Sequence, residues 1–173
     1  PEAAYINPEW NSAIVYTNPH ADNYATGHDG TAENPIRIFN YPEEKPILDA
    51  IKVPVPVSYL HGISLGRVNY VHLKGLTIRN VLQDKESTVH GIVVDYGASN
   101  YVLENMNITN IGGKCYTLYS HFQAEQDGVK LFPEQDGIPS NTIKIINSDA
   151  SFCMDTLARE PGRTDFGNYA DGF

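Results

Sequence analysis

The residues of this chain best suited to chemistry are aspartates near its C-terminal end. Asp171 stands in an Asp-Gly pair between the apolar residues Ala170 and Phe173, just after a polar loop. Packing of these apolar neighbours against a core would leave the carboxylate at the mouth of a strand. Asp171 is therefore the leading candidate site residue.

Further charged residues precede Asp171 at short distances in the sequence: Asp149, Asp155, Arg159, Arg163 and Asp165. We interpret Asp149 and Asp155 as turn formers, and residues 159–163 as a solvated loop. An alternative is a cation site made by Asp165, Asp171 and loop carbonyls. A single carboxylate does not make a tight site for a cation that requires about six to eight oxygen ligands.

Two histidines recur at the same place in a repeated sequence. His61 and His90 each precede a Gly-Ile pair, and together they are a candidate pair of metal ligands. We interpret both as structural residues, each closing a turn before a strand. Glycoside hydrolysis would need two carboxylates across the scissile bond. The sequence shows no convincing pair, so it gives no support to a hydrolase mechanism.

The composition describes one acidic globular domain. The chain has 173 residues, of which 41% are hydrophobic and 19% are charged, so it can bury a core. Its formal net charge of −9 argues against nucleic acid as a partner, because phosphates need a basic surface. No apolar run reaches the ~18 residues of a membrane helix. We therefore expect neither nucleic-acid binding nor membrane insertion.

The two cysteines leave two possibilities open. Cys115 and Cys153 are 38 residues apart, which matches no zinc-binding pattern. They pair in an oxidising compartment, or they remain buried as small apolar residues. The spacing does not decide between a disulfide and two free thiols.

The chain divides into two parts. Residues 1–35 are rich in turn signals and single aromatics, and we expect an irregular segment that packs on or caps the rest, with one short strand near Ala13 to Tyr16. Residues 36–173 hold short β-rich runs separated by Gly, Asn and Pro, with an insertion near residues 122–140. The second part carries the fold.

An internal repeat of about 30 residues runs through the second part. Residues 61–65 return 29 positions later at 90–94, residues 69–71 return 31 positions later at 100–102, and residues 76–80 return 30 positions later at 106–110. A third, weaker copy occupies residues 141–147 and is delayed by about 40 positions from Asn100. The delay indicates an insertion between the second and third copies.

Short strands without helices at this period predict an all-β parallel β-helix. Each circuit of two or three strands stacks on the last, and inward Ile, Val and Leu form a continuous core. Asn80 and Asn110 fit a ladder at one corner, because Asn tolerates the left-handed conformation and stacked amides bond from coil to coil. We expect about five coils, starting at Ile36, Ile63, Ile92, Tyr116 and Ala170.

Several segments resemble those of a known enzyme family. Residues 30–36 and 41–49 resemble the opening coil of bacterial right-handed parallel β-helix enzymes, and residues 75–80 look like their next characteristic segment. Residues 167–173, Gly-Asn-Tyr-Ala-Asp-Gly-Phe, are similar to a motif of polysaccharide lyase family 9, the pectate and rhamnogalacturonan lyases. The earlier segments indicate mainly the fold, whereas the last is more specific. The resemblance covers residues 30–173.

The resemblance implies calcium-dependent β-elimination on a uronate polysaccharide. In that family a cluster of aspartates holds calcium, which stabilises charge on the substrate, and a lysine removes the C5 proton. Only Asp171 matches one of these groups, as a calcium ligand. The other aspartates and the lysine base would lie beyond Phe173, so no catalytic or substrate-binding residue is assigned. An open last coil also exposes unpaired backbone, and we expect the natural protein to continue.

The resemblance also implies a bacterial protein that is secreted, periplasmic or on the cell surface, and that is a monomer when full length. Pectate, rhamnogalacturonan and other uronate polymers present similar carboxylates, so the sequence does not choose among them. Two other classes remain open. One is a β-helix glycoside hydrolase or epimerase. The other is a non-catalytic glycan-binding or surface protein, because a solenoid fold does not imply catalysis.

Overall fold

Short strands make up all the regular structure in the part of the chain that the structure describes. The computed structural model describes residues 4–7, 11–16, 29–53, 59–66, 68–83, 88–95, 99–118, 125–126, 129–130 and 142–155. The strands are β1 (Ala4–Asn7), β2 (Asn11–Tyr16), β3 (Ile36–Phe39), β4 (Ile47–Asp49), β5 (Tyr59–Gly66), β6 (Val71–Lys74), β7 (Thr77–Val81), β8 (Thr88–Asp95), β9 (Tyr101–Glu104), β10 (Asn107–Ile111), β11 (Lys114–Leu118), β12 (Glu125–Gln126), β13 (Val129–Lys130), β14 (Ile143–Ile146) and β15 (Asp149–Cys153).

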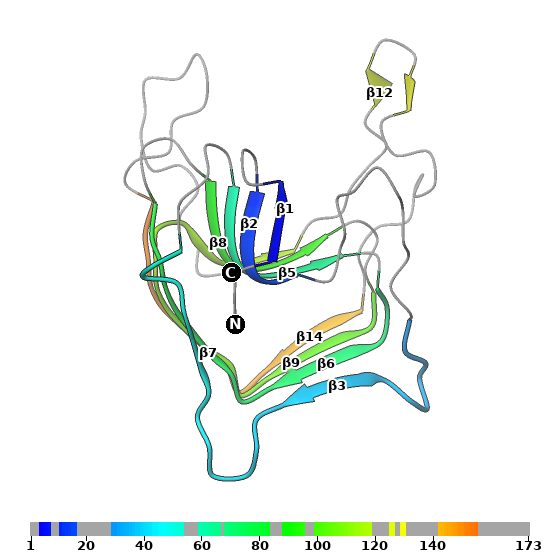
Figure 1. The fold of residues 1–173 in the computed structure, drawn as a ribbon. Coiled ribbons are helices and arrows are strands. Elements are labelled where there is room, and N and C mark those ends of the chain that lie inside the picture. Colours follow the sequence, from blue (N-terminus) through cyan, green and yellow to red (C-terminus); the bar gives the residue numbers. More distant parts are fainter. Residues whose placement is uncertain are drawn as a thin grey trace.

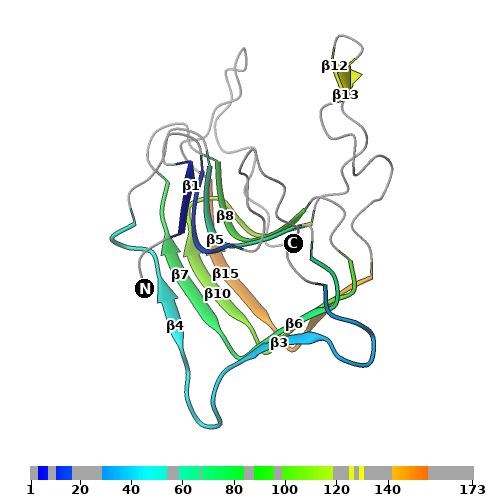
Figure 2. The same ribbon diagram turned by 45° about the vertical axis from the view of Figure 1, so that its right-hand side comes forward.

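Three sheets form the body of the fold (Figures 1 and 2). Sheet A has the order β1-β2-β5-β8-β11, sheet B has β3-β6-β9-β14, and sheet C has β4-β7-β10-β15. All pairs in these sheets are parallel except β1 with β2, at the edge of sheet A. From β3 to β11 the chain visits sheets B, C and A in turn, so each circuit lies on the one before it. The predicted all-β parallel β-helix is confirmed.

The circuits stack at the period that the sequence repeat predicts. Thr77 in β7 pairs with Asn107 in β10, which lies 30 residues later. The next step is longer, because Tyr101 in β9 pairs with Ile143 in β14. The additional residues between these strands include the β12–β13 hairpin, which Figure 1 shows away from the three sheets. The delay of the third repeat therefore reflects an insertion, as expected.

One part of the alignment between copies of the internal repeat is wrong by one residue. The repeat matched residues 69–71 with residues 100–102, but Val71 pairs with Tyr101 in the structure. Both side chains are buried, at 2% and 0% exposure, and take the same inward position in neighbouring coils. The match of Asn69-Tyr70 with Asn100-Tyr101 is misleading. The inward position holds the aliphatic Val71 in one coil and the aromatic Tyr101 in the next.

Residues in the left-handed conformation stand in columns at the corners of the helix. Asn80 and Asn110 have φ values of 58° and 55°, and Asn110 Nδ2 donates a hydrogen bond to Asn80 Oδ1 over 2.7 Å. The predicted asparagine ladder is confirmed. Two further columns, which sequence analysis missed, contain Tyr70, Asn100 and Thr142, and Gly75, Asn105 and Asn147.

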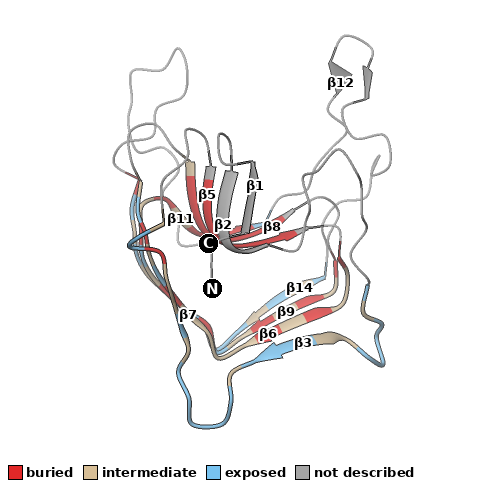
Figure 3. Ribbon diagram, viewed as in Figure 1, coloured by how far each residue is buried: buried red, intermediate tan, exposed pale blue. Residues whose placement is uncertain are grey.

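Buried residues lie mainly in the central coils of the β-helix (Figure 3). Ile78 and Ile108 are neighbours across β7 and β10, and both are fully buried. Burial alternates residue by residue along β6 and β9, as strands with one inward face require. β3 and β14 are more exposed, because each lies at the edge of sheet B. The core therefore depends on having a coil on both sides.

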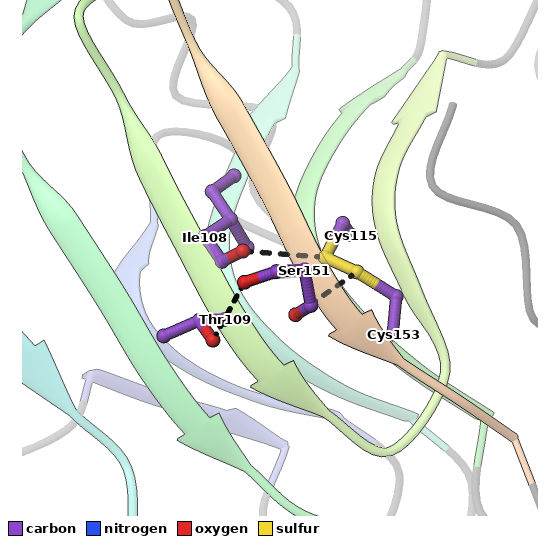
Figure 4. Close-up of a disulfide and its surroundings, with 5 residues drawn as sticks. All are labelled: Ile108, Thr109, Cys115, Ser151 and Cys153. Carbon is purple, nitrogen blue, oxygen red and sulfur yellow. Dashed lines mark hydrogen bonds between the residues drawn. A yellow bond between two sulfur atoms is a disulfide. The ribbon is translucent and has the colours of Figure 1, made fainter.

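A disulfide joins the third and fourth circuits (Figure 4). Cys115 in β11 and Cys153 in β15 are bonded, with their Cα atoms 5.6 Å apart. On the same strand as Cys153, Ser151 Oγ donates a hydrogen bond to Thr109 Oγ1 over 2.9 Å. The sequence left the pairing of the cysteines open, and the structure shows them paired. The bond encloses the β12–β13 hairpin and ties β15 to the preceding coil.

Replacement of Asn110 by Ala should lower the free energy of unfolding by about 1–2 kcal/mol, because the ladder bond is lost and Ala disfavours a positive φ. Asn110→Gly should lose less, since Gly tolerates that conformation. Denaturant unfolding measures both changes, with Asn107→Ala on the exposed side of β10 as the control. Equal losses in the Ala and Gly variants would show that the backbone conformation contributes nothing.

Reduction of the Cys115–Cys153 disulfide should lower the free energy of unfolding by about 2–4 kcal/mol. Amide hydrogen exchange should rise more in β14 and β15 than in β6 and β9, because the fourth coil loses its covalent link. The Cys115→Ser/Cys153→Ser double variant is the control, and its stability should not respond to reductant. An unchanged unfolding midpoint after reduction, with the reduced mass verified, would contradict the stabilising role of the bond.

Candidate functional site

Most of the site predicted from the sequence lies outside the described residues: Asp171, Asp165, Arg159 and Arg163. Two predicted turn formers, Asp149 and Asp155, are described, and neither lies in a turn. Asp149 begins β15, and its backbone N–H donates to the carbonyl of Met106 over 2.8 Å, because pairing with β10 extends through it. Asp155 is 3% exposed, and its Oδ1 accepts a hydrogen bond from Gln83 Nε2 over 3.0 Å. Asp155 thus has a buried structural contact.

His61 and His90 lie side by side in sheet A. The expectation that each closes a turn before a strand is wrong, because pairing of β5 with β8 already begins at Tyr59 and Thr88. The two rings stack with centroids 5.1 Å apart and planes 12° apart, and their Nδ1 atoms are 3.2 Å apart. The 29-residue repeat brings them together, so the pair is a product of strand register.

Burial is the main cause that lowers the pKa of His90 well below its ordinary value, followed by the charges of His61 and Lys114. Lys114 occupies the next position of this column, in register with His90. His90 is therefore neutral near pH 7, and one imidazole Nδ1–H donates to the Nδ1 lone pair of the other. A stacked pair in the core, in which His90 is neutral, fits a structural role better than proton transfer.

The described residues do not form a metal centre. Within the described ranges, no group of three or more His, Cys, Asp or Glu side chains is placed to hold a metal ion. The His61–His90 pair has the right ligand type but no third such group beside it in this part of the chain. Asp171 lies outside the described residues and remains a predicted ligand.

An ion cluster that no sequence motif indicated lies on the outside of sheet B. His72 Nε2 donates to Glu104 Oε2 over 2.9 Å, and Lys74 Nζ donates to Glu104 Oε1 over 2.7 Å. The hydrogen bond from Lys74 is the main cause that lowers the pKa of the Glu104 carboxyl. The repeat could have revealed this cluster, because a 30-residue shift places Glu104 beside Lys74.

A second cluster lies on the outside of sheet C, at the base of the asparagine ladder. Asp49 accepts hydrogen bonds from Asn80 Nδ2 and Arg79 Nε, each over 2.8 Å. These bonds, with the one from Asn80 as the largest cause, lower the pKa of the Asp49 carboxyl. Asp49 accepts the side-chain hydrogen bond of Asn80, the first asparagine of the ladder, so the cluster has a structural role.

Two surface grooves follow the corners of the helix. The first has a volume of about 600 Å³ and lies between the loop after β3 and the next coils, with Phe39, Lys45, Lys74 and Asn107 among its lining residues. The second has a volume of about 560 Å³, and its lining includes Leu82, Ile111, Phe152 and Met154. The first groove combines an aromatic ring, two lysines, two glutamates and amides, whereas the second is mainly apolar.

Comparison with known protein families gives a match over nearly the whole chain. A family model described as "Pel9A-like, right handed beta helix region" matches residues 11–173. The chain belongs to this Pel9A-like family. No curated protein and no solved structure matches the chain.

The Pel9A-like match agrees with the sequence resemblance, and the family description identifies the β-helix as right-handed. The matched range begins at the first residue of β2 and includes sheets B and C completely. It also reaches Asp171, the predicted calcium ligand. Among the described residues, no helix is long and apolar enough to cross a membrane. Membership indicates a pectate-lyase-like family, while the described geometry assigns no catalytic group.

The buried His90 should make the protein less stable as the pH falls below about 6.5. In that range the unfolded chain binds a proton at His90 that the folded protein excludes, because burial lowers its pKa in the folded state. Above that pH neither state is protonated there, and the contribution disappears. The free energy of unfolding, measured from neutral to mildly acidic pH, should therefore fall more in the native chain than in His90→Gln.

Lys52→Gln is the control for this measurement, because Lys52 is exposed in the turn after β4. It should retain the larger pH dependence of the native chain. Identical pH dependence in the native chain and in a folded His90→Gln variant would contradict the assignment of a neutral buried His90.

Proposed function

We propose that this protein is a calcium-dependent polysaccharide lyase that cleaves a uronate-containing polysaccharide, pectate or rhamnogalacturonan, by β-elimination. The observation that carries the proposal is the Pel9A-like family match over residues 11–173. The Ala-Asp-Gly-Phe motif at residues 170–173 supports it, through its similarity to polysaccharide lyase family 9. The parallel β-helix is consistent with both.

The proposed reaction removes the weakly acidic proton at C5 of a uronate and expels the group at C4. It needs a general base and a positive environment for the negative charge that develops at the uronate carboxylate. His90 is buried and neutral, and Lys74 is engaged with Glu104, so neither is assigned as the base. We assign the base to a residue outside the described ranges.

Calcium is the proposed cofactor, and Asp171 is its proposed ligand. Calcium takes about six to eight oxygen ligands. The described residues do not meet that need, since no group of three or more acidic, His or Cys side chains lies together among them. The proposed ligands are therefore Asp171 and other residues outside the described ranges.

We further propose that the protein is exported by a bacterial cell, into the medium, the periplasm or onto the cell surface, and acts as a monomer. The Cys115–Cys153 disulfide supports export, because disulfides persist in oxidising compartments. A polymeric substrate also requires an enzyme outside the cytoplasm. Gel filtration and the disulfide state of the protein purified from its host would test both points.

The test of the lyase proposal is ultraviolet detection of unsaturated uronate from polygalacturonate and from rhamnogalacturonan. Product should form with calcium and disappear with a chelator, since calcium is the proposed cofactor. The assay is specific for a lyase, because only β-elimination leaves the double bond. The natural full-length protein is the appropriate sample. Asp171→Ala should reduce the rate at least about 100-fold if its carboxylate holds the ion on which charge stabilisation depends.

Asp149→Ala is the matched control, because this aspartate is exposed at the start of β15. It should keep the native rate. Full activity of Asp171→Ala would reject Asp171 as the calcium ligand. Saturated products, in place of unsaturated ones, would reject a lyase in favour of a hydrolase.

A further inference from the structure

The outer face of sheet B presents a set of side chains that the proposed function does not use. We call it the outer B face, and its residues are Arg37, Phe39, His72, Lys74, Val102, Glu104, Lys144 and Ile146. They alternate with the inward residues of their strands, and on β6 and β9 the inward neighbours are buried. The described coils therefore leave this face open to solvent.

The outer B face is cationic although the protein is acidic. Arg37, Lys74 and Lys144 carry positive charges, and Glu104 is the one acidic residue of the face. His72 adds a further positive charge when it is protonated. The whole chain has a formal net charge of −9, so a positive surface is a local exception. Such a surface is complementary to an anionic ligand.

Strand register arranges these side chains in two straight rows across the four strands. One row contains Arg37, His72, Val102 and Lys144, and the other contains Phe39, Lys74, Glu104 and Ile146. Neighbouring strands lie ~4.8 Å apart, so each row is about 14 Å long. An extended polymer with regularly spaced charges can follow a row of this length.

Glu104 orients the centre of the outer B face. Its carboxylate accepts hydrogen bonds from His72 and Lys74, which fixes both side chains. The Phe39 ring meets the His72 ring edge-on, with centroids 4.7 Å apart, and Lys74 Nζ is 6.0 Å from the Phe39 centroid. Phe39 is still 44% exposed. An exposed aromatic ring therefore stands beside an ordered ammonium group.

The groove of about 600 Å³ continues this surface toward the corner with sheet C. Phe39 and Lys74 line it from the sheet side, and Glu43, Glu44 and Lys45 line it from the loop that follows β3. The loop side therefore carries two glutamates and one lysine, whereas Lys74 makes the sheet side the positive one. The groove adds a concave end to an otherwise flat face.

We propose that the outer B face and this groove bind a uronate oligosaccharide without calcium. Phe39 would pack against the apolar face of one sugar ring, and Lys74 would contact its carboxylate. Arg37 and Lys144 lie in no ion pair with other described residues, and they would contact carboxylates of neighbouring sugars. The choice of uronate as the ligand rests on the proposed function, and the site holds the polymer on the enzyme.

The test is calorimetric titration of the natural full-length protein with a short oligogalacturonate in the presence of a chelator. Binding should persist without calcium and weaken as salt is added, because exposed charges are screened. Phe39→Ala should weaken it about tenfold through loss of the stacking surface. Arg37→Gln and Lys144→Gln should each weaken it about two- to fivefold.

Lys52→Gln is the matched control for the charge variants, because this lysine is exposed in the turn after β4, away from sheet B. Its affinity should equal that of the native chain. Equal losses in Lys52→Gln and Lys144→Gln would overturn the site, since overall charge would then be the cause. Equal affinity for dextran sulfate would also overturn it, because the face would then lack selectivity for uronates.

This outcome can be separated from the outcome of the lyase assay. Asp171→Ala should bind the oligogalacturonate with native affinity in chelator, whatever its cleavage rate. If the protein cleaves polygalacturonate but Phe39→Ala does not weaken binding in chelator, the binding site on the outer B face is rejected and the lyase proposal is not. A protein that binds in this way but forms no unsaturated product would reject the lyase proposal alone.

Discussion

The constraint on which the rest of the structure depends is the exact stacking of each coil on the one before it. Inward side chains meet their counterparts from the neighbouring coil, as Ile78 meets Ile108. A slip of one residue would exchange every inward side chain of a strand for an outward one. Columns of left-handed residues, such as Asn80 and Asn110, keep the corners aligned so that the period is preserved.

The same stacking produces the polar clusters outside and inside the core. Glu104 meets Lys74, and His90 meets His61, because residues one period apart share a column. His72 contacts Glu104 from the neighbouring column of the same face. Each contact joins two coils and not two segments of one coil. The edge of the stack is weaker, since β14 has a coil on one side only among the described strands, and the disulfide supplies a covalent link there.

Much of the fold could be predicted because the repeat is visible in the sequence. The register of individual strands and the pairing of individual side chains could not. Tyr101 was matched with the wrong residue, since chemical similarity of the side chains is a poor guide to which one points inward. Phe152 has a positive φ at the ladder position of Asn110, where no sequence rule expects an aromatic residue. The disulfide spans an insertion, so spacing could not reveal it. The predicted ligand Asp171 lies outside the described residues, and its place in the site rests on resemblance.

Cysteine cross-linking across β7 and β10 would test the stacking register most directly. Thr77→Cys/Asn107→Cys should form a second disulfide under mild oxidation, because these residues pair in register on the outer side of sheet C and neighbouring strands are ~4.8 Å apart. Thr77→Cys/Thr109→Cys should not, since it is two residues out of register. Efficient cross-linking of the second pair in place of the first would contradict the 30-residue register.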